Sequence, residues 1–300
     1  MGKISRFIYG TLFALLTALV YWFMMVSQGV YFGRRMVLWL YDRGASVYDL
    51  IKRNNPVEEA AFLGIPIAER LARDIGPRPL LLDVAVGTAR LPLALFARPS
   101  YQGNIVGVDI SRQMLAEAAS KVAPYKERIT LLHFPSLPLP FADESFDAVT
   151  CIEAIEFMPD WKGAIAEMVR VLRPGGWLAV TNRIGPTAKL MPGQVEAAPR
   201  FVAFLQSLGL LHVAPHDLKK RYFGQLYYEL ILGQKNGTRA LSQPSDESWL
   251  SALKCPHCDE EGRGVLEAGG RQWRCKGCVG TIRIEDDGVW ALLEESSLSL

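Results

Sequence analysis

Five short apolar segments between residues 80 and 182 constrain the fold more than any other feature of this sequence. Each is bounded by turn residues, as buried strands are, and they span 80–85, 104–110, 128–134, 146–152 and 176–182. Helical stretches such as 114–122 and 163–172 lie between them, and in the second the apolar residues recur at i, i+3, i+4 and i+7. Strands that alternate with helices predict an α/β fold with a parallel sheet covered on both faces. Two longer segments, 212–223 and 225–235, are predicted to add an antiparallel hairpin.

The chain has 300 residues, which is enough for about two domains. Its composition predicts an anchor over 1–35, an amphipathic or lid segment over 36–55, the alternating domain over 56–236, a polar linker over 237–253 and a four-cysteine domain over 254–294. The net charge is only +2, which gives no reason to expect nucleic acid as a partner.

A stretch without any charged residue runs from Phe7 to Gly33. At about 1.5 Å per helical residue it is long enough to cross a hydrocarbon core of about 30 Å. A signal peptide has a shorter apolar region and a small-residue cleavage site, so we expect a helix that spans or deeply enters the membrane. More basic residues follow this stretch than precede it, which predicts a single-pass protein whose C-terminal bulk is cytoplasmic.

The segment 34–53 mixes basic, aromatic and apolar residues. One interpretation is an amphipathic helix that lies along the membrane surface. The other is a helix that packs on the main domain, and the sequence leaves both open.

The turn after the first predicted strand carries small residues between Asp83 and the next apolar stretch. In open parallel sheets, ligands bind beyond the carboxyl ends of the strands. A side chain at Gly87 would fill the space through which the backbone approaches such a ligand. We expect Asp83 to order the loop by accepting backbone hydrogen bonds. Asp109, at the end of the second strand, can accept both hydroxyls of a ribose.

These residues resemble the motifs of class I S-adenosylmethionine-dependent methyltransferases. The run from Asp83 to Ala89 is similar to their D/E-x-G-x-G-x-G motif, with alanine in place of two glycines. Residues 107–115, 137–161 and 168–180 resemble later motifs of the small-molecule group, in the same order. The resemblance implies a Rossmann-like, doubly wound fold and S-adenosylmethionine as cofactor. The cofactor-binding residues that it implies are Asp83, Ala85, Gly87, Asp109, Ile110, Met114, Ser136, Leu137 and Cys151.

The stretch "YDRGASVYD" over 41–49 resembles the lead-in of methyltransferases that act on quinones and similar lipids, where it forms a lid near the cofactor. The resemblance points to Tyr41 and Tyr48 as substrate-lining residues. The alternative is that these two tyrosines only pack a helix. Asn182 and Arg183 end the fifth predicted strand and are expected to face the substrate.

A phenol or amine acceptor needs a general base. Glu153, Glu156 and His133 are the candidates, and we choose Glu156 because it follows the fourth predicted strand.

Four cysteines near the end of the chain follow a C-x2-C-x16-C-x2-C pattern: Cys255, Cys258, Cys275 and Cys278. Two such pairs present four thiolates tetrahedrally, which suits structural Zn²⁺. Because four protein ligands close the site, we expect no zinc catalysis. The pattern resembles the zinc ribbons attached to some methyltransferases.

Together these features predict a membrane-anchored methyltransferase. Its expected partners are the lipid bilayer and a lipophilic small-molecule acceptor, such as a quinone precursor or another lipid. The alternative is a catalytically inactive subunit with the same fold, which assists or assembles a membrane protein complex.

Overall fold

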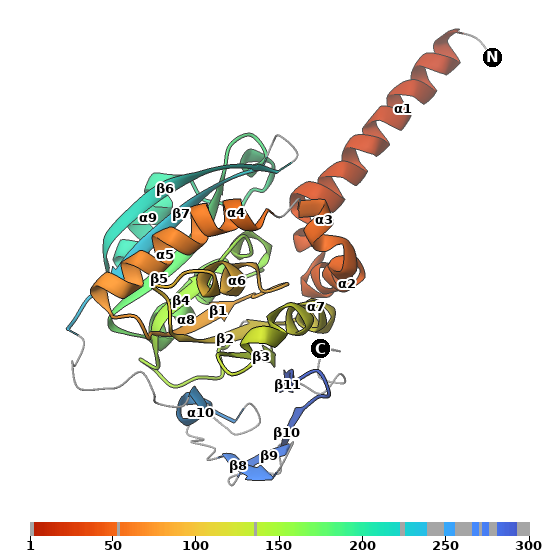
Figure 1. The fold of residues 1–300 in the computed structure, drawn as a ribbon. Helices are drawn as coiled ribbons and strands as arrows, with labels where there is room; N and C mark the ends of the chain where they lie inside the picture. The colour runs from red at the N-terminus through yellow and green to blue at the C-terminus, as the bar shows by residue number, and fades with distance from the viewer. Residues whose placement is uncertain are drawn as a thin grey trace.

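The computed structural model describes residues 3–52, 55–134, 137–222, 226–238, 249–255, 266–269, 272–275 and 281–292. Its centre is a sheet in which the first five strands along the chain are parallel to one another. They are β1 (Leu80–Val84), β2 (Asn104–Asp109), β3 (Ile129–His133), β4 (Phe146–Cys151) and β5 (Leu172–Ile184). The strand order is β6-β7-β5-β4-β1-β2-β3-β11-β10-β9-β8 (Figure 1). Strands β6 (Leu210–Tyr222) and β7 (Leu226–Lys235) pair antiparallel, and β7 also pairs antiparallel with β5. The predicted parallel sheet and its final hairpin are confirmed.

Helices cover both faces of the sheet because the strands are apolar on both sides. Leu80 and Leu82 pack into a core with α8 (Trp161–Val171) and α9 (Ala198–Ser207). Leu81 packs on the opposite face, in a second core with α5 (Ile65–Asp74), α6 (Arg90–Phe96) and α7 (Arg112–Val122). The alternating pattern thus gives the three-layer arrangement that it predicts.

Strand β5 begins earlier than the sequence predicts, directly where α8 ends. Phe146 of β4 pairs with Leu172, but Ala148 pairs with Trp177, so four residues of β5 bulge out of the ladder. Gly175 lies in this bulge with a φ of +74°, a backbone conformation that glycine adopts readily.

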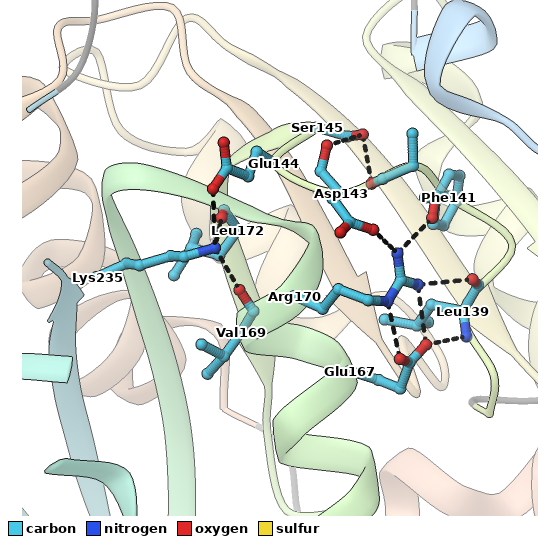
Figure 2. A network of polar contacts seen from close by, with 11 residues as sticks. Leu139, Phe141, Asp143, Glu144, Ser145, Glu167, Val169, Arg170, Leu172 and Lys235 are labelled. Atoms are coloured by element: carbon cyan, nitrogen blue, oxygen red, sulfur yellow. Dashed lines mark hydrogen bonds and ion pairs between the residues drawn. The ribbon is translucent and has the colours of Figure 1, made fainter. Parts of the chain in front are cut away.

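The loop that joins β3 to β4 is held on α8 by Arg170 (Figure 2). The guanidinium donates to the carbonyl oxygens of Phe141 and Leu139 at 2.8 and 3.1 Å, and it pairs with Glu167 and Asp143. Lys235 of β7 donates to the carbonyl oxygens of Val169 and Leu172 at 2.9 and 2.7 Å, at the end of α8. These contacts join the loop over residues 139–143 to α8, and α8 in turn to β7.

The N-terminal helix α1 (Lys3–Tyr21) projects away from the body of the protein and continues as a π-helical turn over Trp22–Ser27 (Figure 1). The stretch Arg6–Ser27 is long and apolar enough to cross a membrane, with a mean hydropathy of 1.8, and its most apolar window is unburied. The C-terminal end of this helical segment, here called its foot, contacts the main domain. The Trp22 indole donates to the Leu190 carbonyl oxygen at 3.0 Å. The Tyr31 hydroxyl likewise donates to the Pro192 carbonyl oxygen at 2.9 Å.

Short helices follow this N-terminal helical segment: α2 (Arg34–Gly44), α3 (Tyr48–Lys52) and α4 (Pro56–Glu59). They pack on the main domain at the carboxyl ends of β1 and β2. Of the two interpretations of residues 34–53, packing on the domain is therefore observed, although several apolar side chains there stay exposed.

The C-terminal strands β8 (Leu266–Gly269), β9 (Gln272–Cys275), β10 (Thr281–Ile284) and β11 (Trp290–Ala291) extend the central sheet, because β11 pairs parallel with β3. The short helix α10 (Trp249–Ala252) lies within the predicted linker, and Leu253 after it bridges to Phe141. Cys255 and Cys275 are buried. Cys258 and Cys278 lie outside the described residues, so the zinc site stays a prediction.

Candidate functional site

The turn after β1 keeps a glycine-type conformation although two of its three small residues are alanines. Ala85, Gly87 and Ala89 have φ angles of 58°, 54° and 63°. A left-handed conformation costs an L-residue about 1–2 kcal/mol, so the fold holds both alanines in place against that cost. No heavy atom lies within 4 Å of the position that a Cβ would take at Gly87. A side chain there would enter the cavity that Gly87 lines.

Two buried aspartates stand at the ends of β1 and β2. Asp109 accepts hydrogen bonds from the backbone N–H groups of Gly87 and Ser111, both at 2.8 Å, and burial raises its pKa to about 6. Asp83 accepts a hydrogen bond from the Thr150 hydroxyl at 2.6 Å, and burial raises its pKa to about 7. Among the described residues, the backbone N–H group of Gly87 therefore donates to Asp109 and not to Asp83. The expectation that Asp83 orders this loop through backbone bonds is therefore wrong.

A cavity, here named the cofactor cavity, opens at these strand ends. Four groups of residues line it: Ala85 and Gly87 of the turn; Asp109, Ile110 and Ser111; Ile152, Glu153, Ala154, Phe157 and Met158 after β4; and Val37, Leu38, Tyr41 and Tyr48 of the N-terminal helices. Leu137 borders an adjoining cavity that shares Val37, Leu38, Ile110, Phe157 and Met158 with it. An acid, an open glycine turn and apolar walls are what a nucleoside needs, so the residues fit S-adenosylmethionine.

Residues 41–52, here named the lid segment, are hydrogen-bonded to residues at both edges of this cavity. Asp42 accepts a hydrogen bond from the Ser111 hydroxyl at 2.5 Å, and Asp49 accepts one from the Thr88 hydroxyl at 2.8 Å. Lys121 also pairs with Asp49. The two aspartates of "YDRGASVYD" thus place its two tyrosines over the cavity. The motif points to the tyrosines, whereas the role of the two aspartates becomes visible only in the folded chain.

The rings of Tyr41 and Tyr48 lie 6.1 Å apart between centroids, and Tyr41 lies 6.2 Å from the ring of Phe157. The three rings form an aromatic wall of the cavity. Contact of the tyrosines with a substrate stays a prediction.

A buried charge cluster joins the lid segment and α4 to the domain. Arg90 at the start of α6 donates to both carboxylate oxygens of Glu59 at 3.0 Å and lies 3.3 Å from the carboxylate of Glu153. Lys52 lies 3.4 Å from Glu153. Glu153 therefore lies between two cationic side chains. These residues are scattered between positions 52 and 153, and no motif links them.

Glu156 is buried next to the cofactor cavity, but it does not line that cavity in the described part of the chain. Burial raises its pKa, and its Oε1 accepts a hydrogen bond from the Tyr228 hydroxyl at 2.5 Å. Its Oε2 is buried with no hydrogen-bond partner among the described residues. Its neighbours Ala154 and Phe157 line the cofactor cavity. The choice of Glu156 as the base remains a prediction.

Several expected site residues lie elsewhere. Cys151 is fully buried in the core, where burial raises its thiol pKa, and Met114 lines a second cavity beneath the lid segment. Asn182 donates to the Glu196 carbonyl oxygen at 3.2 Å. Arg183 is buried and donates to the Val26 carbonyl oxygen at 2.8 Å. None of these four lines the cofactor cavity in the described part of the chain.

His133 places its Nε2 3.0 Å from the carbonyl oxygen of Ile110, and burial lowers its pKa. It therefore supports the end of β2. Ser136 lies outside the described residues.

Comparisons with known proteins agree with this geometry. A protein family described as a methyltransferase domain matches residues 82–180. The demethylmenaquinone methyltransferase of Desulfitobacterium hafniense is 38% identical over 119 residues, which is 39% of this chain and 46% of that protein. That of Bacillus cereus is 36% identical over 115 residues, or 38% of this chain and 48% of that protein. The matches thus span about half the length of these curated relatives.

Solved structures show the same fold at low sequence identity. The cyclase SpnF superposes with a TM-score of 0.54 at 18% identity, over 68% of this chain and 97% of that one. Phosphoethanolamine N-methyltransferase 2 of Haemonchus contortus, solved with S-adenosylhomocysteine, gives a TM-score of 0.51 at 18% identity, over 65% of this chain and 58% of that one. Residues 82–180 therefore match a methyltransferase domain, and the solved structures show that this part of the chain has their Rossmann-like fold.

Proposed function

We propose that this chain is an S-adenosylmethionine-dependent methyltransferase that works at a membrane surface on a lipophilic acceptor. The observation that carries the proposal is the corner formed by Gly87 and Asp109. An open glycine turn and a buried carboxylate border one cavity, within a domain that matches methyltransferases.

When bound, S-adenosylmethionine supplies a methyl group on a sulfonium sulfur. The residues of this chain bind and orient the reactants, and such positioning contributes about 7–11 kcal/mol to a reaction of this kind. Asp109 would hold the ribose of the cofactor, and the turn at Gly87 would leave room for it. Tyr41, Tyr48 and Phe157 exclude water. Glu156, backed by Tyr228, takes the proton that a phenol or amine acceptor loses.

The proposed acceptor is a quinone precursor or another lipid. The relatives bear the name demethylmenaquinone methyltransferase, and the exposed apolar helix α1 would keep the site close to lipid. Anchoring raises the effective concentration of a membrane-bound acceptor at the site. The basic residues that follow the anchor favour a cytoplasmic catalytic domain.

The zinc site belongs to the same proposal. The spacing of Cys255, Cys258, Cys275 and Cys278 supports structural Zn²⁺ in the C-terminal segment. Its role there is to hold the ribbon together.

Calorimetric titration of S-adenosylmethionine into the full chain in lipid nanodiscs tests the proposal. The full chain is needed because Val26, at the foot of the anchor, covers the buried Arg183. We expect micromolar binding that Asp109→Ala abolishes. Asp74→Ala, which removes the carboxylate that pairs with Arg70 and Arg73 at the end of α5, should leave binding intact. Absence of binding by the folded wild type would favour the inactive accessory subunit.

A further inference from the structure

A second cavity, here named the lid groove, lies between the foot of the anchor and the lid segment. Met24 and Met25 of the π-helical turn form one side, and Leu40 and Ile51 of α2 and α3 form the other. Methionine side chains are flexible and fill irregular apolar space, so these walls can adapt to a chain-like ligand.

The lid groove and the cofactor cavity share a wall. Tyr41 and Tyr48 line both cavities, so the two aromatic rings separate the groove from the Asp109 corner. A ligand that lies in the groove therefore has one end beside the tyrosines that cover the cofactor cavity.

The apolar surface of α1 leads into this groove without interruption. The large apolar side chains along the helix are exposed, and Met24 at its foot is 46% exposed. Trp39, Leu50 and Ile51 continue the exposed apolar surface on α2 and α3. Exposed apolar patches of this kind mark membrane or ligand contacts. The hydrogen bonds of Trp22 and Tyr31 to the domain fix the position of the groove relative to α1.

Three polar side chains of the groove are engaged within the protein. Gln28 accepts a hydrogen bond from the Tyr41 hydroxyl at 2.6 Å, and Lys52 pairs with Glu153 at 3.4 Å. Removing Lys52 from a buried carboxylate to serve an anionic head group would be costly. The groove therefore suits a hydrocarbon chain better than a phosphate or another charged head group.

We propose that the lid groove takes the hydrocarbon tail of the lipid acceptor directly from the bilayer, with the reactive head lying toward Tyr41 and Tyr48. This inference rests on the proposed function. It adds a second binding site, a ligand chemistry for it and a route of entry from the membrane.

Gly44 offers a variant that fills the groove. It borders the cavity, its φ and ψ of −89° and −9° are accessible to any residue, and no heavy atom lies within 4 Å of an added Cβ. Gly44→Leu therefore places a side chain in the groove without backbone strain. Gly10→Leu is the matched control, because Gly10 also has open space around it but lies within α1, away from the groove.

The experiment uses the full chain in nanodiscs that contain a diazirine-bearing farnesyl lipid, and cross-linked residues are mapped by mass spectrometry. We expect labels on α1 and on the groove walls around Leu40 and Ile51. In Gly44→Leu, labelling of the groove should fall about tenfold, the ratio for a loss of about 1.4 kcal/mol of binding, while labelling of α1 is kept. Gly10→Leu should keep both. The inference is overturned if the wild type carries label on α1 alone, or if Gly44→Leu keeps its groove label.

Calorimetry of S-adenosylmethionine on the same samples separates this inference from the proposed function. A thermal unfolding transition at the wild-type temperature in Gly44→Leu shows that the domain is folded. Groove labelling without cofactor binding in the wild type would remove the enzyme proposal and leave a lipid-binding groove. If Gly44→Leu fails to fold, Ile51→Trp narrows the groove from its partly exposed rim, and the same loss of label is expected.

Discussion

The N-terminal and C-terminal segments both join the central domain through charged side chains, but the two contacts differ in burial. Lys52 and Glu59 come from the N-terminal helices and meet Glu153 and Arg90 in the interior, with side chains 1–12% exposed. At the C-terminal contact, Arg112 meets Glu285 and Asp287 with side chains 25%, 39% and 32% exposed.

The difference in burial matches a difference in role. The N-terminal contact lies beside the cofactor cavity and supplies Tyr41 and Tyr48 to its walls. The C-terminal contact adds β11 to the edge strand β3. Covering an edge strand protects it from pairing with other chains. We therefore assign function to the first contact and edge protection to the second, and each prediction below tests that division.

The largest effect is expected for Arg90→Met. This change leaves Glu59 and Glu153 as two buried carboxylates without the cation that bridges them. Removing one partner from a buried ionic group costs about 3–5 kcal/mol, so the free energy of unfolding should fall by that amount. Chemical denaturation of the full chain in detergent measures it. If the free energy of unfolding fell by less than about 1 kcal/mol, the ordinary contribution of an exposed ion pair, the buried N-terminal contact would be no stronger than the exposed C-terminal one.

The sheet and the Asp83–Gly87–Asp109 corner could be predicted because they depend on local pattern. Strand periodicity is a property of neighbouring residues, and the carboxyl ends of parallel strands meet at one edge. The charge cluster could not be predicted in this way. Lys52, Arg90 and Glu153 are brought together only by the packing of α3 and α6 against the end of β4.

Expected site residues that do not line the cavity show what the local sequence pattern cannot predict. The resemblance predicts Cys151 beside the cofactor, but Cys151 is still within β4, where both faces of the sheet are covered by apolar cores, and the cavity begins beyond the strand end. Residues just beyond it, such as Ile152 and Ala154, line the cavity instead. Arg183 lies near the end of β5 as expected, yet it donates to the Val26 carbonyl oxygen in the π-helical turn that continues α1. That contact depends on a helix more than 150 residues earlier in the chain.

A smaller effect, on ligand binding, is expected for Asp49→Ala. The change removes the hydrogen bond from Thr88 and the ion pair with Lys121, which hold the lid segment against the turn. We expect the Kd for S-adenosylmethionine to rise about tenfold, equivalent to about 1.4 kcal/mol. Calorimetry measures it, and Asp287→Ala is the matched control at the C-terminal contact. Equal weakening in both variants would contradict the division of roles.

Cofactor binding should also depend on pH. Burial raises the pKa of Asp109 to about 6, and the nearby charge of Asp42 in the lid segment adds to the rise. Below this pH Asp109 is protonated and is a poorer acceptor for ribose hydroxyls, so affinity should fall as the pH drops through about 6.

Asp42→Asn sharpens this test because it removes the lid charge and keeps an acceptor for Ser111. The midpoint of the binding profile should move to lower pH in this variant. Asp287→Asn should leave the midpoint where it is. Titrations between pH 5 and pH 8 in one buffer series compare the three proteins, and an unmoved midpoint in Asp42→Asn would show that the lid charge does not reach Asp109.

The smallest effect is expected for Arg112→Met at the C-terminal contact. Partly exposed ion pairs contribute at most about 1 kcal/mol, and salt near 1 M screens most of that. Arg112 is also the first residue of α7, where the helix dipole disfavours a cation, so its removal recovers part of the loss. We expect the free energy of unfolding to fall by less than about 1 kcal/mol and the cofactor Kd to stay unchanged. If Arg112→Met weakened cofactor binding as much as Asp49→Ala, the C-terminal segment would have to act on the site through Ser111, the neighbour that hydrogen-bonds both Asp109 and the lid segment.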